Sequence, residues 1–188
     1  MRNIIANKRM NAYEVLENFK DILNPSQAPI ELDSLLDALN INLNNNLEIE
    51  NLNNTGYIEV KDNNIKIWVN PLKNNLISRE RFTIAHELGH LFLHIAPENK
   101  NAIFKDTEET LKRNSYWNIK EYEANNFAAQ LLMPKDLILK EGKAIIELYK
   151  EQYNDLPYQE DFIKMMAEKF NVSKLAMKYR LKNLGAIK

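Results

Sequence analysis

Apolar and polar residues recur with two different periods along this chain, and together they predict a mixed α and β fold. Around residues 13–19 and 31–39, apolar positions repeat at helical spacing, and the first of these stretches ends near Asn24. Residues 57–61 and 65–70 instead alternate with a period of two around an Asp-Asn-Asn turn, and Pro71 follows. This second pattern predicts a β-hairpin.

The second half of the chain reads as helical. A helix is predicted from Ser78, acting as its cap, through His94 to the Ala-Pro pair at 96–97, and another over residues 120–132 before Pro134. The asparagine-rich residues 44–54 and the polar residues 98–118 are expected to be irregular. After a break near residues 154–157, two short helices that meet at residues 170–173 resemble a helix-turn-helix, with Ser173 as a cap.

Composition narrows the class of protein. The 188 residues are 45% hydrophobic and carry a net charge of −1, which fits one compact domain with a small appendage. No apolar run approaches the roughly 18 residues of a membrane-spanning helix, and the first eight residues lack the apolar core of a secretion signal, so we expect no membrane partner. The chain has no cysteine, which excludes disulfides, thiol catalysis and cysteine-bound zinc and fits a cytoplasmic protein.

The candidate metal-binding and catalytic residues lie around the three histidines of the chain, His86, His90 and His94. Residues 86–90 match H-E-x-x-H, in which two histidines one helical turn apart bind a single Zn²⁺. Glu87 is then placed beside a metal-bound water as the general base of a hydrolase. Apolar residues on both sides of this motif predict a buried helix, and buried histidines and a glutamate are costly without a metal or partners.

A third ligand must come from elsewhere. On a straight helix the three histidines span about 12 Å of rise, so His94 is expected to support the site from outside the ligand set. Without cysteine the ligand must be a carboxylate, and Glu121 is the first choice because it shares a helix face with Ala124, Asn125 and Ala128. Glu123 is the second choice, since it points about 160° away by helix rotation.

Two supporting roles follow from the same segment. Asn125, one turn beyond Glu121, is expected to hydrogen-bond a metal ligand. A donor for the oxyanion of the reaction could be Tyr116 or Tyr122, and the sequence does not choose between them.

Three blocks in this order, residues 81–90, 121–129 and 131–134, resemble the ImmA/IrrE family of metallo-endopeptidases, and residues 172–185 match more weakly. The resemblance implies an α+β fold: a small twisted sheet packed on a helical core with the H-E-x-x-H helix, followed by helix-turn-helix-like helices. It implies a gluzincin-type peptidase core over residues 1–134 and a helical subdomain over residues 135–188. It also implies His86, His90 and Glu121 as ligands of one Zn²⁺, Glu87 as the base, and a transcriptional repressor as substrate, often one encoded on the same prophage or mobile element.

Two surfaces carry further expectations. One strand of the hairpin over residues 57–70 is expected to be the sheet edge to which an extended substrate adds, and the alternative is a purely structural hairpin. Residues 164–188 carry a net charge of +6 against −7 for the rest of the chain, so this end could dock onto the acidic body or a repressor, or contact DNA. Its leucines and Met177 also fit plain structural packing onto the core. DNA is the less favoured partner.

The alternative to a peptidase is a regulator that binds a repressor or DNA and keeps the metal only for structure.

Overall fold

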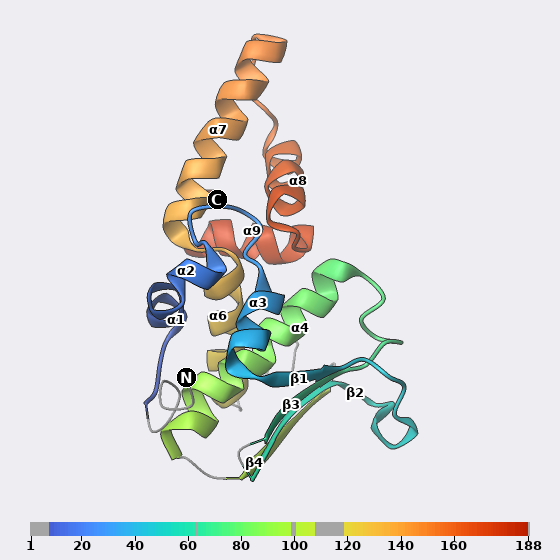
Figure 1. Cartoon of the computed structure of the whole chain (residues 1–188). Coiled ribbons are helices and arrows are strands. Elements are labelled where there is room, and N and C mark those ends of the chain that lie inside the picture. Colours follow the sequence, from blue (N-terminus) through green and yellow to red (C-terminus); the bar gives the residue numbers. More distant parts are fainter. Residues whose placement is uncertain (1–7, 63, 99–100, 108–118, 188) are drawn as a thin grey trace.

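The computed structural model describes residues 8–62, 64–98, 101–107 and 119–187, and it has the predicted α+β architecture. Figure 1 shows a small sheet crossed on one face by the long helix α4, with α7 and α8 extending away from the sheet as a helical hairpin. The N-terminal helices are α1 (Ala12–Asn18), α2 (Lys20–Leu23) and α3 (Leu32–Leu39). The later helices are α4 (Ile77–His90), α6 (Ile119–Leu132), α7 (Lys135–Tyr153), α8 (Gln159–Phe170) and α9 (Lys174–Asn183). No helix in these described ranges is long and apolar enough to cross a membrane.

The sheet contains the predicted hairpin and two further strands. Its order is β1-β3-β2-β4, with β1 parallel to β3 and with β2 antiparallel to both of its neighbours. The strands are β1 (Ile41–Asn44), β2 (Asn54–Lys61), β3 (Asn64–Val69) and β4 (Ala102–Thr107), and the short 3₁₀ turn η1 (Ile49–Asn51) precedes β2. The expectation that residues 44–54 and 98–118 are irregular was therefore wrong at β1, η1, the start of β2 and β4.

The expected free edge of the hairpin is also wrong. Within the described chain β1 covers β3 and β4 covers β2, so both hairpin strands are interior. The pairing partners come from segments that are distant in sequence and too short to show a clear period of two.

Helix α4 is held against the sheet by both apolar and polar contacts. The inward row of the sheet includes the buried Ile58 and Ile67, which lie opposite each other on β2 and β3. Near the N-terminal half of α4, Thr83 Oγ1 donates to Asn74 Oδ1 at 2.7 Å, and Asn74 Nδ2 donates to the carbonyl of Thr55 at 2.8 Å. These bonds fix the position of the helix along β2.

The ends of α4 differ from the prediction in two ways. The helix is capped by the backbone of Leu76 without a side-chain bond, so Ser78 is not its cap. After His90 the helix widens into a π-helical turn, η2 (Leu91–Ile95), and a 3₁₀ turn, η3 (Ala96–Glu98), follows. Because a π-helical turn changes the angle between successive side chains, His94 does not continue the straight α-helical row of His86 and His90.

Two short C-terminal helices meet near residues 170–173, as predicted. Asn171 adopts a left-handed conformation at the end of α8, and the Ser173 hydroxyl accepts a hydrogen bond from the Ala176 amide at the start of α9. Arg180 on α9 donates from Nε to the carbonyl of Met133 at 2.9 Å, and Leu181 is buried in the main apolar core. The division of the chain at residue 134 stays a prediction.

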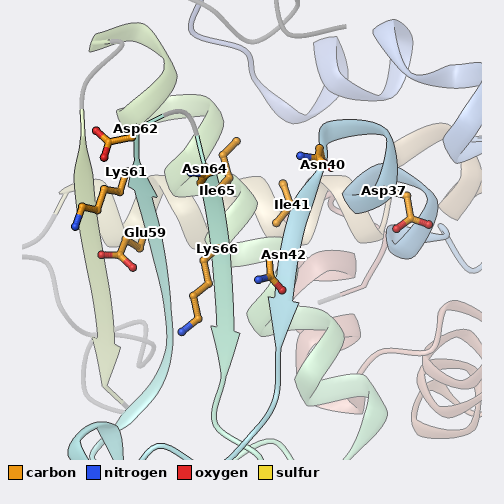
Figure 2. Close-up of a pocket in the computed structure, with 10 residues that line it drawn as sticks. All are labelled: Asp37, Asn40, Ile41, Asn42, Glu59, Lys61, Asp62, Asn64, Ile65 and Lys66. Carbon is orange, nitrogen blue, oxygen red and sulfur yellow. The ribbon is translucent and has the colours of Figure 1, made fainter.

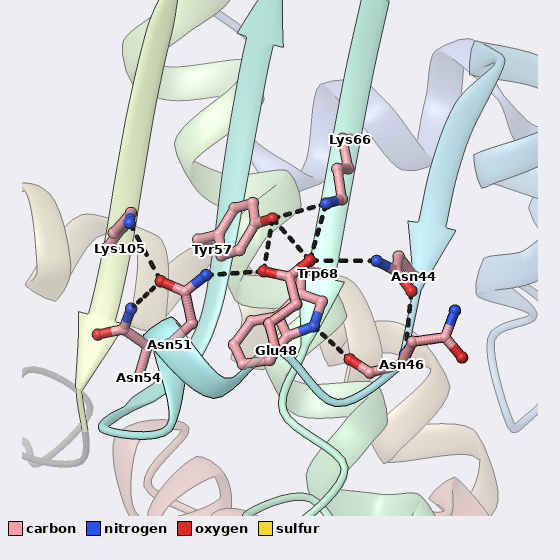
Figure 3. Close-up of polar contacts among 9 residues, drawn as sticks. All are labelled: Asn44, Asn46, Glu48, Asn51, Asn54, Tyr57, Lys66, Trp68 and Lys105. Carbon is pink, nitrogen blue, oxygen red and sulfur yellow. Dashed lines mark hydrogen bonds and ion pairs between the residues drawn. The ribbon is translucent and has the colours of Figure 1, made fainter.

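The outward face of the sheet carries a polar network around Glu48 (Figure 3). The Glu48 carboxylate accepts hydrogen bonds from Lys66 Nζ at 2.9 Å, from Asn51 Nδ2 at 2.7 Å and from the Tyr57 hydroxyl at 3.0 Å. The Tyr57 ring stacks on Trp68 with centroids 5.3 Å apart. Burial raises the pKa of Glu48, but the bonds from these donors outweigh burial, and the pKa is lowered overall.

The Glu48 network predicts a pH-dependent contribution to stability. Because the folded pKa lies below the ordinary value of 4.5, the stabilisation is present above that value and is lost as the pH falls through the folded pKa. Glu48→Gln should therefore lower the free energy of unfolding by about 1 kcal/mol at neutral pH. The difference from wild type should shrink at about pH 3, as measured by urea denaturation. Glu50→Gln, at an exposed position of η1, is the control and should differ little from wild type at either pH.

A second prediction concerns the close approach of α4 and α6. A Cβ added to Gly89 would lie 3.0 Å from the Ala124 Cα and 3.1 Å from its carbonyl oxygen, both backbone atoms of α6. Gly89→Ala should therefore cost about 1–3 kcal/mol in chemical denaturation, because the helices must move apart. Gly142→Ala, also in a helix interior, would meet only side-chain atoms, the tip of the Phe162 ring at 3.3 Å and Met166 at 3.8 Å, and should stay within about 1 kcal/mol of wild type. Equal losses for the two variants would contradict the importance of this contact.

Candidate metal centre

Helix α4 presents two histidines into a space between the sheet and α6. His86 and His90 are one turn apart, both are fully buried, and their Nε2 atoms lie 3.0 Å from each other. Both rings therefore point their Nε2 atoms to one spot, as the H-E-x-x-H spacing predicts.

Two carboxylates from different elements meet the histidines there. From α6, Glu121 places Oε2 at 3.2 Å from His86 Nε2 and Oε1 at 3.4 Å from His90 Nε2. From β4, Asp106 places Oδ2 at 2.9 Å from His86 Nε2 and at 3.7 Å from His90 Nε2. One ligand atom from each of these four buried residues lies within 4.8 Å of every other.

The donor set and its unpaired oxygens fit a divalent metal ion. Both carboxylate oxygens of Glu87, both of Asp106 and Oε2 of Glu121 are buried without a hydrogen-bond partner. Buried carboxylates without partners cost several kcal/mol each, and a bound cation removes that cost. Imidazole nitrogens with carboxylate oxygens are a ligand set found for Zn²⁺ and for other first-row divalent ions.

The far side of each ring is held by a hydrogen bond. His86 Nδ1 lies 3.1 Å from Asn125 Oδ1, so with this amide oxygen as acceptor Nδ1 carries a hydrogen and Nε2 is the atom that faces the cluster. His90 Nδ1 lies 3.1 Å from His94 Nδ1. Bonds of this kind orient metal-binding imidazoles and fix their tautomers.

A chain of contacts determines the tautomer of His90. His94 Nε2 donates to Glu123 Oε2 at 3.0 Å, and Arg9 Nη2 donates to the other oxygen of Glu123 at 2.6 Å. Hydrogen bonds from His94 and Arg9 lower the pKa of Glu123, and burial lowers the pKa of His94, so the pair is a carboxylate beside a neutral imidazole. His94 Nδ1 is then an acceptor, the hydrogen between the rings belongs to His90 Nδ1, and Nε2 of His90 faces the cluster.

The charges in this enclosed space shift each other's pKa values. Burial lowers the pKa of His86, but its contacts with Asp106 and Glu121 outweigh burial and raise it to about 9. Burial raises the pKa of Glu121, but the two histidines outweigh this and lower it overall. The pKa of Glu87 is raised well above its ordinary value, first by burial and then by the neighbouring Asp106 and Glu121 carboxylates.

Glu87 lies beside the cluster without belonging to it, and β2 approaches it closely. A Cβ on Gly56 would lie 2.8 Å from Glu87 Oε1 and 2.7 Å from the Thr83 methyl group. Gly56 is therefore the residue at which the sheet can come this near to the Glu87 carboxylate.

The predicted site residues occupy the following places. His86, His90 and Glu121 come together, Asn125 and His94 each contact one of the two histidines, and Glu123 lies outside the cluster and contacts His94 and Arg9. Tyr116 lies outside the described residues, and Tyr122 is 64% exposed.

Sequence reasoning missed Asp106 and the role of Arg9. Asp106 lies in the stretch expected to be irregular, where residues 103–106 read apolar, apolar, charged, charged and show no period of two. Arg9 lies before the first predicted helix, and nothing in its surroundings indicates a contact with residue 123.

A separate hollow lies at the opposite end of β2 and does not share these residues. It measures about 680 Å³, and Figure 2 shows Glu59 and Lys66 among its lining side chains. Its lining carries both signs of charge, and none of its side chains is among the described buried groups without a partner. The chemistry is therefore concentrated at the histidine cluster and not in this hollow.

Comparison with known families identifies the class of protein. The chain matches a peptidase family model, the IrrE N-terminal-like domain, over residues 66–182, which is more than half of its 188 residues. The chain therefore belongs to this peptidase family, and the resemblance to ImmA/IrrE proteins is confirmed. No curated protein matches the chain.

The cluster predicts how metal binding responds to loss of a carboxylate. Glu121→Gln keeps the size of the side chain but removes the anionic oxygens that lie near both histidines. Its affinity for Zn²⁺, measured by competition with a chromogenic chelator, should fall by more than roughly 100-fold, the upper end of the loss for residues that only support a ligand. Glu147→Gln, at an exposed position of α7, is the control and should bind Zn²⁺ as wild type does. Unchanged affinity of Glu121→Gln would exclude Glu121 as a ligand.

Proposed function

We propose that this chain is a zinc-dependent endopeptidase in which His86, His90 and Glu121 hold the metal ion and Glu87 is the general base. The observation that carries the proposal is a buried cluster of two histidines and a carboxylate with an unpaired glutamate directly beside it, in a chain of a peptidase family. A peptidase acts on proteins or peptides, so a protein substrate follows from the family. The repressor as substrate rests on the resemblance to ImmA/IrrE proteins.

The bound metal would polarise the carbonyl of the scissile peptide bond and lower the pKa of a coordinated water to about 7. Glu87 takes a proton from the attacking water on a carboxylate oxygen and later passes it to the leaving amine. Burial of Glu87 away from bulk solvent supports this role, because proton exchange with solvent is slowed in an enclosed site.

The residues around the ligands hold the two histidine rings in position. Asn125 and His94 each hold one histidine ring so that Nε2 faces the metal position. Glu123 and Arg9 hold His94 in turn, and this chain of contacts reaches the solvent-facing side of the molecule. These residues orient the site and do not touch the reacting atoms.

A non-catalytic, structural metal site is the second candidate, and Asp106 is the observation that favours it. Structural zinc sites are closed by four protein ligands, and Asp106 makes four available here. Glu87 argues against this candidate, because a structural site has no use for a fifth buried ionisable group whose oxygens have no partner. The peptidase is therefore the better-supported function.

The test separates metal binding from catalysis. Glu87→Gln should keep Zn²⁺ but lose roughly 10²–10⁴-fold in cleavage rate, because the base is gone while the ligands remain. The substrate is the repressor-type protein encoded beside this chain's gene, and any cut is mapped by mass spectrometry. Glu147→Gln is the matched control and should cleave at the wild-type rate.

Two outcomes would contradict the proposal. Equal cleavage by Glu87→Gln and wild type would show that Glu87 is not the base. Cleavage that survives removal of the metal by a chelator would show that the reaction does not need the metal.

DNA as a partner of the basic C-terminus stays a prediction. Part of the positive charge there is neutralised by ion pairs within the chain: Lys178 Nζ lies 2.9 Å from Glu160 Oε1, and Lys169 Nζ lies 3.3 Å from Glu141 Oε2.

A further inference from the structure

The strand that faces the catalytic residues is β2. Gly56 is where it comes nearest to Glu87, and in the same row of the sheet Gly56 is paired with Asp106 of β4. An extended peptide that ran along β2 on the β4 side would therefore pass both Glu87 and the metal cluster. Peptides that add to a sheet edge gain main-chain hydrogen bonds from the strand and specificity from alternate side chains.

That position is already occupied by a segment of the chain itself. Strand β4 pairs antiparallel with β2 from the Val60–Ala102 pair to the Asn54–Thr107 pair. The register shifts between Asn54 and Gly56, opposite Thr107 and Asp106. An irregularity of this kind re-aims a side chain, and here it lies at the residue whose carboxylate enters the metal cluster.

The inward side chains of β4 cover the cluster. The Phe104 ring stacks on His90 with centroids 4.6 Å apart and on His94 at 5.9 Å. Two residues further along, Asp106 Oδ2 lies 2.9 Å from His86 Nε2, so it takes a position close to both histidines. An aromatic side chain and a metal-binding carboxylate thus block the centre from one strand.

The outward side of β4 makes few contacts among the described residues. Within that part of the chain it is an outer strand whose one neighbour is β2, its outward-facing Ile103 is 50% exposed, and Lys105 is exposed. The outward contacts of Lys105 are a hydrogen bond to Asn51 Oδ1 at 3.1 Å and an approach to the Tyr57 ring at 5.8 Å. A six-residue strand with few outward contacts can leave at a modest free-energy cost compared with an interior strand.

From these contacts we infer that β4 is a self-blocking strand, which occupies the substrate's place on β2 and puts Asp106 into the metal centre. The inference rests on the proposed peptidase function and adds its regulation: a substrate, or a partner that binds β4, must displace the strand before a peptide can bind. With β4 displaced, three protein ligands remain and one position is free for water, as catalytic zinc sites require. The peptide class that fits is an extended segment with a large apolar residue where Phe104 lies.

The test locks the strand with a disulfide. Glu59 on β2 and Ile103 on β4 are directly paired on the outward face, and the chain has no cysteine of its own. Glu59→Cys with Ile103→Cys therefore gives one defined pair of thiols, which tie β4 to β2 when oxidised and release it when reduced. The single variant Glu59→Cys, treated in the same way, controls for the oxidant.

Binding is measured separately from catalysis. The probe is a fluorescein-labelled synthetic peptide with the sequence of residues 101–107, and the protein is Zn²⁺-loaded and carries Glu87→Gln so that the peptide stays intact. Fluorescence anisotropy should show binding to the reduced pair at least tenfold tighter than to the oxidised pair, with equal metal content in both. Equal affinity in the two states would overturn self-blocking.

Cleavage by the same pair with Glu87 restored then distinguishes the two proposals. Loss of repressor cleavage on oxidation, recovered on reduction, supports self-blocking together with the peptidase. Equal cleavage in both states overturns self-blocking and leaves the peptidase standing. Redox-dependent peptide binding without cleavage in either state supports the blocking strand and counts against the peptidase.

Discussion

Five ionisable side chains are buried together, and the structure around them must offset the energetic cost of burying their charges. His86, Glu87, His90, Asp106 and Glu121 are all buried, and three of them are acidic. Isolated charges in such a space are costly, and a cation held between the converging ligand atoms would offset that cost. Convergence in turn requires α4, α6 and β4 to approach each other within the reach of short side chains.

Small residues make that approach feasible. Gly89 allows α4 to contact the backbone of Ala124 on α6, and Gly56 allows β2 to lie against Glu87. The Thr83–Asn74–Thr55 hydrogen bonds then fix α4 along the sheet, so that the histidines face the cluster and not a neighbouring turn. The geometry of the centre therefore depends on backbone distances as much as on the ligands themselves.

The parts of the site that lie on single helices could be predicted from the sequence. The spacing of His86 and His90, and the shared face of Glu121, Ala124 and Asn125, follow from the rotation of 100° per residue in an α-helix. The hairpin of β2 and β3 and the cap at Ser173 were equally local and were predicted correctly. The edge of the sheet and Asp106 could not be found in this way, because β4 pairs with residues about 50 positions away in β2 and its own short segment shows no period of two. The contact of Arg9 with Glu123 is non-local for the same reason, and the π-helical turn after His90 has no distinct sequence signal.

The position of β4 also has a consequence for contacts between molecules. If β4 leaves, β2 presents a row of unpaired amide and carbonyl groups, and such an edge can pair with the same edge of another copy of the chain. A strand that covers β2 therefore limits self-association as well as access to the centre. Displacement by a bound peptide exposes these groups least, because the peptide covers the same amide and carbonyl groups of β2 as β4 leaves them.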